Sequence, residues 1–196
     1  MINIDFDEKQ YLLLYPDVAA AIKDGKIKSG RDHYEIFGRV EGRSNAIGGQ
    51  LTRVEKALAH IQKNGFGLEI GPSHNPIAPR SKGFNVQILD HMSSAELKEK
   101  YRDHNVNLEN IEDVNYVWNG QPLPELIGKT ACYDYIIASH VIEHVPDLIS
   151  FLQQCEKLLK PDGILSLVIP DKRYCFDYFD PVTSTGEVLD AWARSE

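Results

Sequence analysis

Residues 133–171 constrain the fold more than any other part of the chain. They read YDYIIASHVIEHVPDLISFLQQCEKLLKPDGILSLVIPD. The hydrophobic pattern predicts two buried strands, 133–138 and 164–169, joined by an amphipathic helix over 146–159 that Pro161–Gly163 should end. Strands that are apolar throughout and alternate with helices indicate a parallel sheet covered on both faces. The sequence therefore predicts an α/β fold.

Bulk properties narrow the class of protein. The chain has 196 residues, 42% of them hydrophobic, and a formal net charge of −8. This length suits one domain with a hydrophobic core plus a small appendage. No stretch has the length and apolarity of a membrane span, and no signal-peptide pattern is seen at the N-terminus. The acidic balance disfavours nucleic-acid binding. Three scattered cysteines give neither a disulfide framework nor zinc-ligand spacing, so we expect a cytoplasmic protein with reduced thiols.

The first 45 residues predict a small helical module. Asp7 can cap a first helix, Pro16 should end or kink it, and Asp17 can open a second. A third helix is expected over 32–40. Helices this short bury little core alone, so we expect them to pack on each other and on the next domain. We predict boundaries at 1–45 for the module, 46–63 for a linker helix that follows a hinge at 45–49, and 64–196 for the α/β domain.

The module carries a recognisable series of short motifs. In order these are F-D-E, Y-L, P-D-V, H-Y and F-G-x-x-E-G-R, within residues 6–44. The series resembles a helical module that accompanies bacterial glycosyltransferases, surface-polysaccharide enzymes and some secreted calcium-binding proteins. The resemblance implies a packing or docking role, with a glycosyltransferase or polysaccharide-assembly protein as partner. No set of residues suited to chemistry is evident in it.

Two further predicted strands, 66–70 and 86–89, end in residues typical of a nucleotide-like ligand site. Gly71 lets the backbone turn sharply after the first strand, next to Glu69. Asp90 ends the second strand 19 positions later and can accept hydrogen bonds from ribose hydroxyls. Prolines at 72, 76 and 79 argue against a helix after Gly71. The pyrophosphate of a dinucleotide commonly binds at the N-terminus of that helix. The expected absence of the helix therefore argues against an NAD-binding site.

Four segments together resemble a class I S-adenosylmethionine-dependent methyltransferase of the branch whose first motif reads E-I-G-P. They are LEIGPSHNPI, QILDHMS, YDYIIASHVIEHVPD and LLKPDGILSLVIPD, within about residues 65–180. The resemblance implies a seven-stranded, Rossmann-like, mostly parallel sheet with helices on both faces. No sequence for strands six and seven is found, so we expect a fragment or a sheet that is short at one edge. The resemblance assigns cofactor contacts to these residues: Glu69, Gly71, Ser73, Asp90, His91, Asn119, Gly120, Ser139 and His140.

Within that assignment Glu69 and Gly71 would hold the methionine end, Asp90 the ribose, Asn119–Gly120 the adenine, and Ser139–His140 the sulfonium. The chain departs from the family pattern at two positions. Ser73 stands where a second glycine is frequent, and Asn119 stands where an aspartate is commoner.

The run from His140 to His144 has a second interpretation. H-x-x-E-H is also an inverted zinc-hydrolase signature, which requires both histidines on one helix. Here the run follows a strand directly and Pro146 comes soon after it, so we predict no metal. Two interpretations of these histidines stay open. They have a structural role at the end of the strand, or they face the cofactor or the acceptor. A hydroxyl acceptor needs a base. His140 and His144 are the main candidates, beside Glu143 and Asp177.

The segment after the last predicted strand offers charges to an acceptor. Lys172 and Arg173, with Asp177 nearby, could bind an anionic group such as a phosphate or uronate, or could be solvated rim charges. We therefore predict methyl transfer to a small-molecule or glycan acceptor, in particular a sugar or a surface-polysaccharide precursor. Two alternatives remain: an NAD-linked sugar oxidoreductase or epimerase, and a methyltransferase-like domain that binds without catalysis.

Overall fold

The chain forms two compact units, residues 1–52 and 53–196. The structure, a computed structural model, describes residues 6–38, 40, 41, 43, 53–175, 177 and 179–195. The predicted hinge at 45–49, and the predicted linker helix before residue 53, lie outside the described residues. Among the residues that are described, no helix is long and apolar enough to cross a membrane.

The N-terminal unit is built around one buried tyrosine. It contains α1 (Glu8–Leu14), α2 (Pro16–Lys23) and α3 (Gly30–His33), and α3 continues into a π-helical turn, Tyr34–Gly38. Tyr11 is fully buried, and its hydroxyl lies 3.0 Å from Nδ1 of His33. A Cβ added to Gly38 would lie 2.6 Å from the same hydroxyl. The H-Y and F-G motifs therefore maintain this unit's own core.

Two helix predictions for this unit need correction. Pro16 does not merely end the first helix: it is the first residue of α2, where a missing N–H costs nothing. The third helix begins at Gly30 and not at Asp32, because the Ser29 hydroxyl caps it by accepting from the Asp32 N–H at 3.0 Å. Its regular part ends at His33, well before the predicted residue 40.

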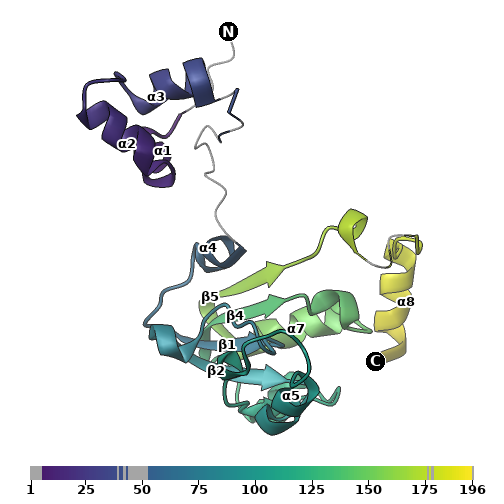
Figure 1. Cartoon of the computed structure of the whole chain (residues 1–196). Helices are drawn as coiled ribbons and strands as arrows, with labels where there is room; N and C mark the ends of the chain where they lie inside the picture. Colours follow the sequence, from purple (N-terminus) through teal and green to yellow (C-terminus); the bar gives the residue numbers. More distant parts are fainter. Residues whose placement is uncertain are drawn as a thin grey trace. The chain divides into compact units, whose positions relative to one another are not determined.

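The C-terminal unit is a five-stranded parallel sheet with helices packed around it (Figure 1). The strand order is β3-β2-β1-β4-β5. The direction in which strands are added thus reverses between β1 and β4, where ligands commonly bind in such sheets. The four predicted strands are confirmed, and a fifth strand, β3, is only two residues long. The bounds are β1 Phe66–Ile70, β2 Asn85–Asp90, β3 Tyr116–Val117, β4 Tyr133–Ser139 and β5 Leu159–Val168.

Successive residues of β4 face opposite layers, as the period of a strand requires. Ile136 packs in the core with α6 (Leu123–Ile127) and α7 (Leu148–Leu158). Tyr135 packs on the other face with Ala57 of α4 (Arg53–Leu58). Two more helices complete the unit, α5 (Ser94–Lys100) and α8 (Thr185–Ser195). Both faces of the sheet are therefore covered.

Three helix boundaries differ from the predictions. α7 begins at Leu148, because Asp147 is its N-cap and accepts from the Ser150 N–H at 3.0 Å, so Pro146 lies outside the helix. α7 ends at Leu158, and β5 starts at once; Pro161–Gly163 form an irregularity in that strand and do not end the helix. α4 ends five residues before 63, where the Ile61 N–H donates to the Leu58 carbonyl and the chain turns.

The connection from β1 to β2 contains no α-helix, as the prolines predicted. It holds only one 3-10 turn, Arg80–Lys82. Arg80 ties this connection to its surroundings. Its Nε donates to the Val86 carbonyl at 2.9 Å, and its Nη2 donates to Asn115 Oδ1 at 2.6 Å. The hydrogen bonds of Arg80 therefore hold this connection against the sheet, although it contains no α-helix.

Candidate functional site

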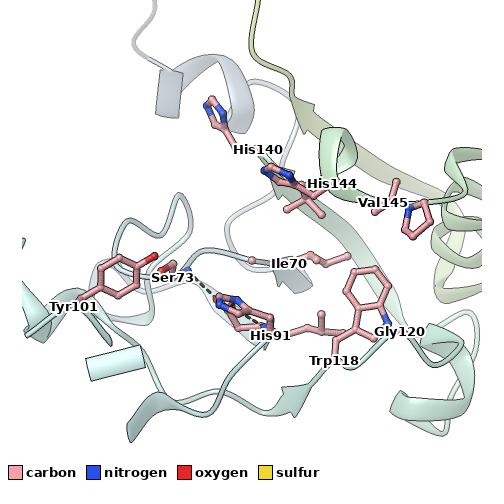
Figure 2. Close-up of a pocket in the computed structure, with 14 residues that line it drawn as sticks. Ile70, Ser73, His91, Tyr101, Trp118, Gly120, His140, His144 and Val145 are labelled. Atoms are coloured by element: carbon pink, nitrogen blue, oxygen red, sulfur yellow. Dashed lines mark hydrogen bonds and ion pairs between the residues drawn. The ribbon is translucent and has the colours of Figure 1, made fainter. Parts of the chain in front are cut away.

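A cavity of about 530 Å³ opens at the carboxyl ends of β1, β2 and β4. Its volume falls within the range of small-molecule sites, roughly 300–1,000 Å³. It lies at the point where the strand order reverses. In Figure 2, His140 and His144 lie on one side of the cavity, and Ser73, His91 and Trp118 lie on the other. Six of the predicted cofactor residues line it: Gly71, Ser73, Asp90, His91, Gly120 and His140.

The loop after β1 closes one end of this cavity. Gly71 has a positive φ of 65°, and its N–H donates to the Leu89 carbonyl at 2.8 Å. A Cβ at that position would lie 3.0 Å from Val141 Cγ2, so both conformation and space favour glycine. Ser73 also has a positive φ, 50°, and its Oγ is buried with no hydrogen-bond partner. An unpartnered buried hydroxyl in a cavity wall fits a polar ligand.

Asp90 is the buried acid of the site, with only 1% of its surface exposed. Its Oδ2 accepts from the Ser73 N–H at 2.9 Å, which joins the end of β2 to the loop after β1. Its Oδ1 accepts from the His91 backbone N–H at 2.8 Å and lies 2.6 Å from Nδ1 of the His91 ring. A buried carboxylate with these partners is oriented before any ligand binds.

Glu69 is buried as well, but it does not line the cavity. Its two carboxylate oxygens accept from the Ile77 N–H at 2.6 Å and the Ala78 N–H at 3.0 Å. Burial raises the pKa of Glu69 to about 7, although these two hydrogen bonds act in the opposite direction. In this structure Glu69 therefore fixes the connection between β1 and β2.

Two histidines stand at the rim of the cavity after β4. His140 has a positive φ of 57°, and its backbone N–H donates to the Val168 carbonyl at 2.9 Å. Its Nδ1 lies 3.4 Å from Glu143 Oε1. His144 ends a 3-10 turn, Ile142–His144, so the two histidines do not share an α-helix. Within the described part of the chain, no group of three His, Cys, Asp or Glu side chains is placed to hold a metal ion.

Two other predicted cofactor residues lie beside the cavity without lining it. The Ser139 hydroxyl accepts from Nη1 of Arg53 at 3.1 Å, which links α4 to the end of β4. Asn119 is exposed, and its N–H donates to Gln121 Oε1 at 2.7 Å. Its neighbour Gly120, with a φ of 91°, does line the cavity.

The predicted acceptor-binding residues are already paired with neighbouring acids, and none lines the cavity. Lys172 Nζ donates to the Asp177 carbonyl at 2.6 Å and lies 3.7 Å from its Oδ2. Arg173 Nη2 lies 2.6 Å from Asp171 Oδ2. The Arg173 guanidinium lowers the pKa of Asp171 to about 2. These cations have partners within their own loop.

The sequence did not single out the aromatic part of the cavity. Trp118 lines it, donates from Nε1 to the Gln121 carbonyl at 2.8 Å, and packs beside Phe151 with 6.2 Å between ring centroids. Tyr101 lines it from the end of α5. Trp118 directly precedes the predicted Asn119–Gly120 segment, and that adjacency was the one available signal.

Comparisons with known proteins point to one family. The family model described as a methyltransferase domain matches residues 43–194. The mitochondrial ubiquinone biosynthesis O-methyltransferase of Bos taurus is 34% identical over 74 residues, which cover 37% of this chain and 20% of that protein. Its counterpart from Rickettsia akari is 31% identical over 119 residues, 57% of this chain and 43% of that protein. The chain therefore spans less than half the length of either of these two relatives.

A similar solved structure is that of a SAM-dependent methyltransferase from Aquifex aeolicus. It is 20% identical, with a TM-score of 0.45, and the match covers 74% of this chain and 79% of that one.

Proposed function

Because this chain belongs to the methyltransferase-domain family, whose members use S-adenosylmethionine, we propose that its C-terminal unit binds this cofactor in the cavity and methylates a hydroxyl group. One observation carries the proposal. The buried carboxylate of Asp90, at the end of β2, meets the backbone of the loop that turns at Gly71. This is the arrangement that a ribose and its attached groups require in a sheet of this order.

We place the parts of the cofactor by the chemistry of the walls. Asp90 accepts from a ribose hydroxyl, and Trp118 with Gly120 borders the adenine. The polar methionine end lies toward Gly71 and Ser73, whose buried Oγ lacks a partner. The sulfonium then faces the rim that carries His140 and His144.

The chemistry needs little from the protein beyond placement and removal of a proton. When bound, S-adenosylmethionine supplies a methyl group on a positively charged sulfur. The walls at Gly71, Ser73 and Asp90 would hold the cofactor so that this methyl group could be transferred to an acceptor oxygen that gives up its proton. We assign the acceptor proton to the imidazole of His144 or His140, because both stand at the rim. The walls exclude water and hold the reactants in line.

The acceptor class follows from the wall and from the relatives. Val141, Val145 and Pro146 give the rim beside His144 an apolar side, which suits an aromatic ring better than a sugar. The curated relatives named above are O-methyltransferases of ubiquinone biosynthesis. We therefore propose a phenolic hydroxyl. The sugar acceptor predicted from the N-terminal motifs has no support among these relatives, and the NAD-linked alternative is not favoured.

Calorimetry with S-adenosylhomocysteine tests the cofactor site. We expect the full chain to bind it, and Asp90→Asn to weaken binding by about ten- to a hundredfold, the worth of a hydrogen bond to a charged group. Asp103→Asn is the matched control, since Asp103 is exposed and does not line the cavity. No binding by the wild-type chain, or equal binding by Asp90→Asn, would falsify the proposal.

A labelled-methyl assay tests the reaction. We expect transfer from S-adenosylmethionine to a catechol but not to a nucleotide sugar. His144→Ala or His140→Ala should reduce the rate by about 10²- to 10⁴-fold, the usual contribution of a general base, with binding of S-adenosylhomocysteine kept. Binding without transfer to any acceptor would instead identify a non-catalytic binding domain.

A further inference from the structure

The imidazole of His91 stands at the edge of the cavity (Figure 2), and it contacts an anion on one side and a cation on the other. Its Nδ1 is 2.6 Å from Asp90 Oδ1, and its Nε2 is 3.1 Å from Lys100 Nζ. Lys100 does not line the cavity, whereas His91 and Asp90 do. Three side chains therefore form one line of contacts that begins outside the cavity and ends on its buried acid.

Helix α5 fixes the spacing of this line. The helix starts at a capping box in which the Ser93 hydroxyl accepts from the Glu96 N–H while the Glu96 side chain accepts from the Ser93 N–H. Leu97 anchors it with 1% of its surface exposed. Lys100 is its last residue, and its Nζ also lies 5.4 Å from the centroid of the Tyr101 ring. Lys100 thus reaches His91 from a rigid and packed base.

The contacts decide which ring nitrogen of His91 carries the proton. The ammonium of a lysine has three N–H donors and no lone pair, so Nε2 of His91 must accept from Lys100. The ring proton then sits on Nδ1, which donates to Asp90 Oδ1. Lys100 therefore acts on Asp90 through His91, by holding the imidazole as the tautomer that donates to the carboxylate.

The same contacts leave Asp90 with little free capacity. A carboxylate can accept about four hydrogen bonds. Oδ1 already accepts from the His91 backbone and ring, and Oδ2 accepts from the Ser73 N–H. One acceptor position, on Oδ2, is left for a ligand.

We propose that Lys100 and His91 are positioning residues that orient Asp90 so that its remaining acceptor position binds a single ribose hydroxyl. This inference rests on the proposed function, because it assumes a cofactor that contains ribose. It predicts that the cavity distinguishes the 2′- from the 3′-hydroxyl, since a single acceptor position cannot serve both equally.

Two substitutions at His91 separate its two contacts. His91→Asn keeps a donor where Nδ1 stands, and His91→Gln keeps an acceptor near Nε2 but gives Asp90 no donor. Lys100→Met removes the ammonium and keeps the length of the side chain over Tyr101. Calorimetry measures the binding of S-adenosylhomocysteine and its 2′-deoxy and 3′-deoxy analogues to each full-length variant. Thermal melts then show that the variants are folded.

We expect His91→Asn to bind S-adenosylhomocysteine within about twofold of the wild-type chain. His91→Gln and Lys100→Met should bind it about three- to tenfold more weakly, because Asp90 must be immobilised during binding. One of the two deoxy analogues should bind the wild-type chain weakly. Its affinity for His91→Gln and Lys100→Met should be no lower than its affinity for the wild-type chain. In turnover the KM for S-adenosylmethionine should rise while kcat stays unchanged.

Two results would overturn the inference while leaving the proposed function intact. One is equal binding of S-adenosylhomocysteine by His91→Gln and His91→Asn. The other is an equal loss for all three ligands, which would mean that His91 only supports the local fold. Failure of the wild-type chain to bind S-adenosylhomocysteine would overturn both proposals.

Discussion

Glu69 makes the stability of the C-terminal unit depend on pH. Burial raises its pKa from 4.5 to about 7 in the folded chain. The folded state therefore holds a proton that the unfolded state has lost between these values, so the contribution is fully present below pH 4.5 and disappears as pH rises through about 7. Each pKa unit corresponds to about 1.4 kcal/mol. The stability lost across this window is therefore about 3 kcal/mol.

Glu69→Gln removes the titrating group and keeps the shape of the side chain. The amide nitrogen cannot accept from Ile77 or Ala78, which costs about 1–3 kcal/mol at every pH. That constant loss cancels when each protein is compared with itself across pH. The free energy of unfolding of the variant, minus that of the wild-type chain, should rise by about 3 kcal/mol between roughly pH 4.5 and pH 8.

Urea unfolding followed by circular dichroism, at half-unit steps of pH, measures this difference. Glu125→Gln supplies the reference curve for the loss of one negative charge at an exposed position. A difference between Glu69→Gln and wild type that stays flat across the window would refute the reasoning. It would mean that the hydrogen bonds from Ile77 and Ala78 outweigh burial and keep the carboxylate ionised.

Two further substitutions test how the sheet is held. Gly67→Ala should lower the free energy of unfolding by about 1–3 kcal/mol in urea titrations, because a Cβ there would overlap the buried ring of Tyr135; an unchanged midpoint would contradict this packing. Arg80→Met should speed tryptic cleavage after Lys82, a site that both proteins keep, and cost at least about 2 kcal/mol, since several hydrogen bonds of about 1 kcal/mol each are lost. Cleavage at the wild-type rate would show that the connection is held by other contacts.

Local pattern was enough to predict most of the architecture. The strand around Ile136 is apolar on both faces, with Ile136 in one layer and Ile137 in the other, as in a parallel sheet covered on both sides. The prolines after Gly71 predicted the missing crossover helix correctly, because proline removes an N–H and clashes inside a helix. Helix α6 was missed, since five residues are too few to show a helical period.

Contacts between residues that lie far apart in the sequence could not be predicted from local sequence pattern. Nothing near Arg80 indicated that it would bond to Asn115, 35 positions away. Lys172 and Arg173 were predicted to face an acceptor, whereas each contacts an acid of its own loop. A charge pattern shows which groups are present, but folding decides which of them find partners.

Backbone strain supplies an independent reason to place function at this cavity. Only four described non-glycine residues have a positive φ, and two of them, Ser73 and His140, line the cavity. This conformation costs an ordinary residue roughly 1–2 kcal/mol, so a chain selected for stability alone would favour glycine at both positions. At Ser73 the side chain presents a buried hydroxyl without a hydrogen-bond partner to the cavity, and at His140 it presents an imidazole at the rim. We therefore propose that both side chains are retained for what they present to a ligand. Replacing either by glycine should raise the free energy of unfolding in urea titrations and weaken the binding of S-adenosylhomocysteine in calorimetry.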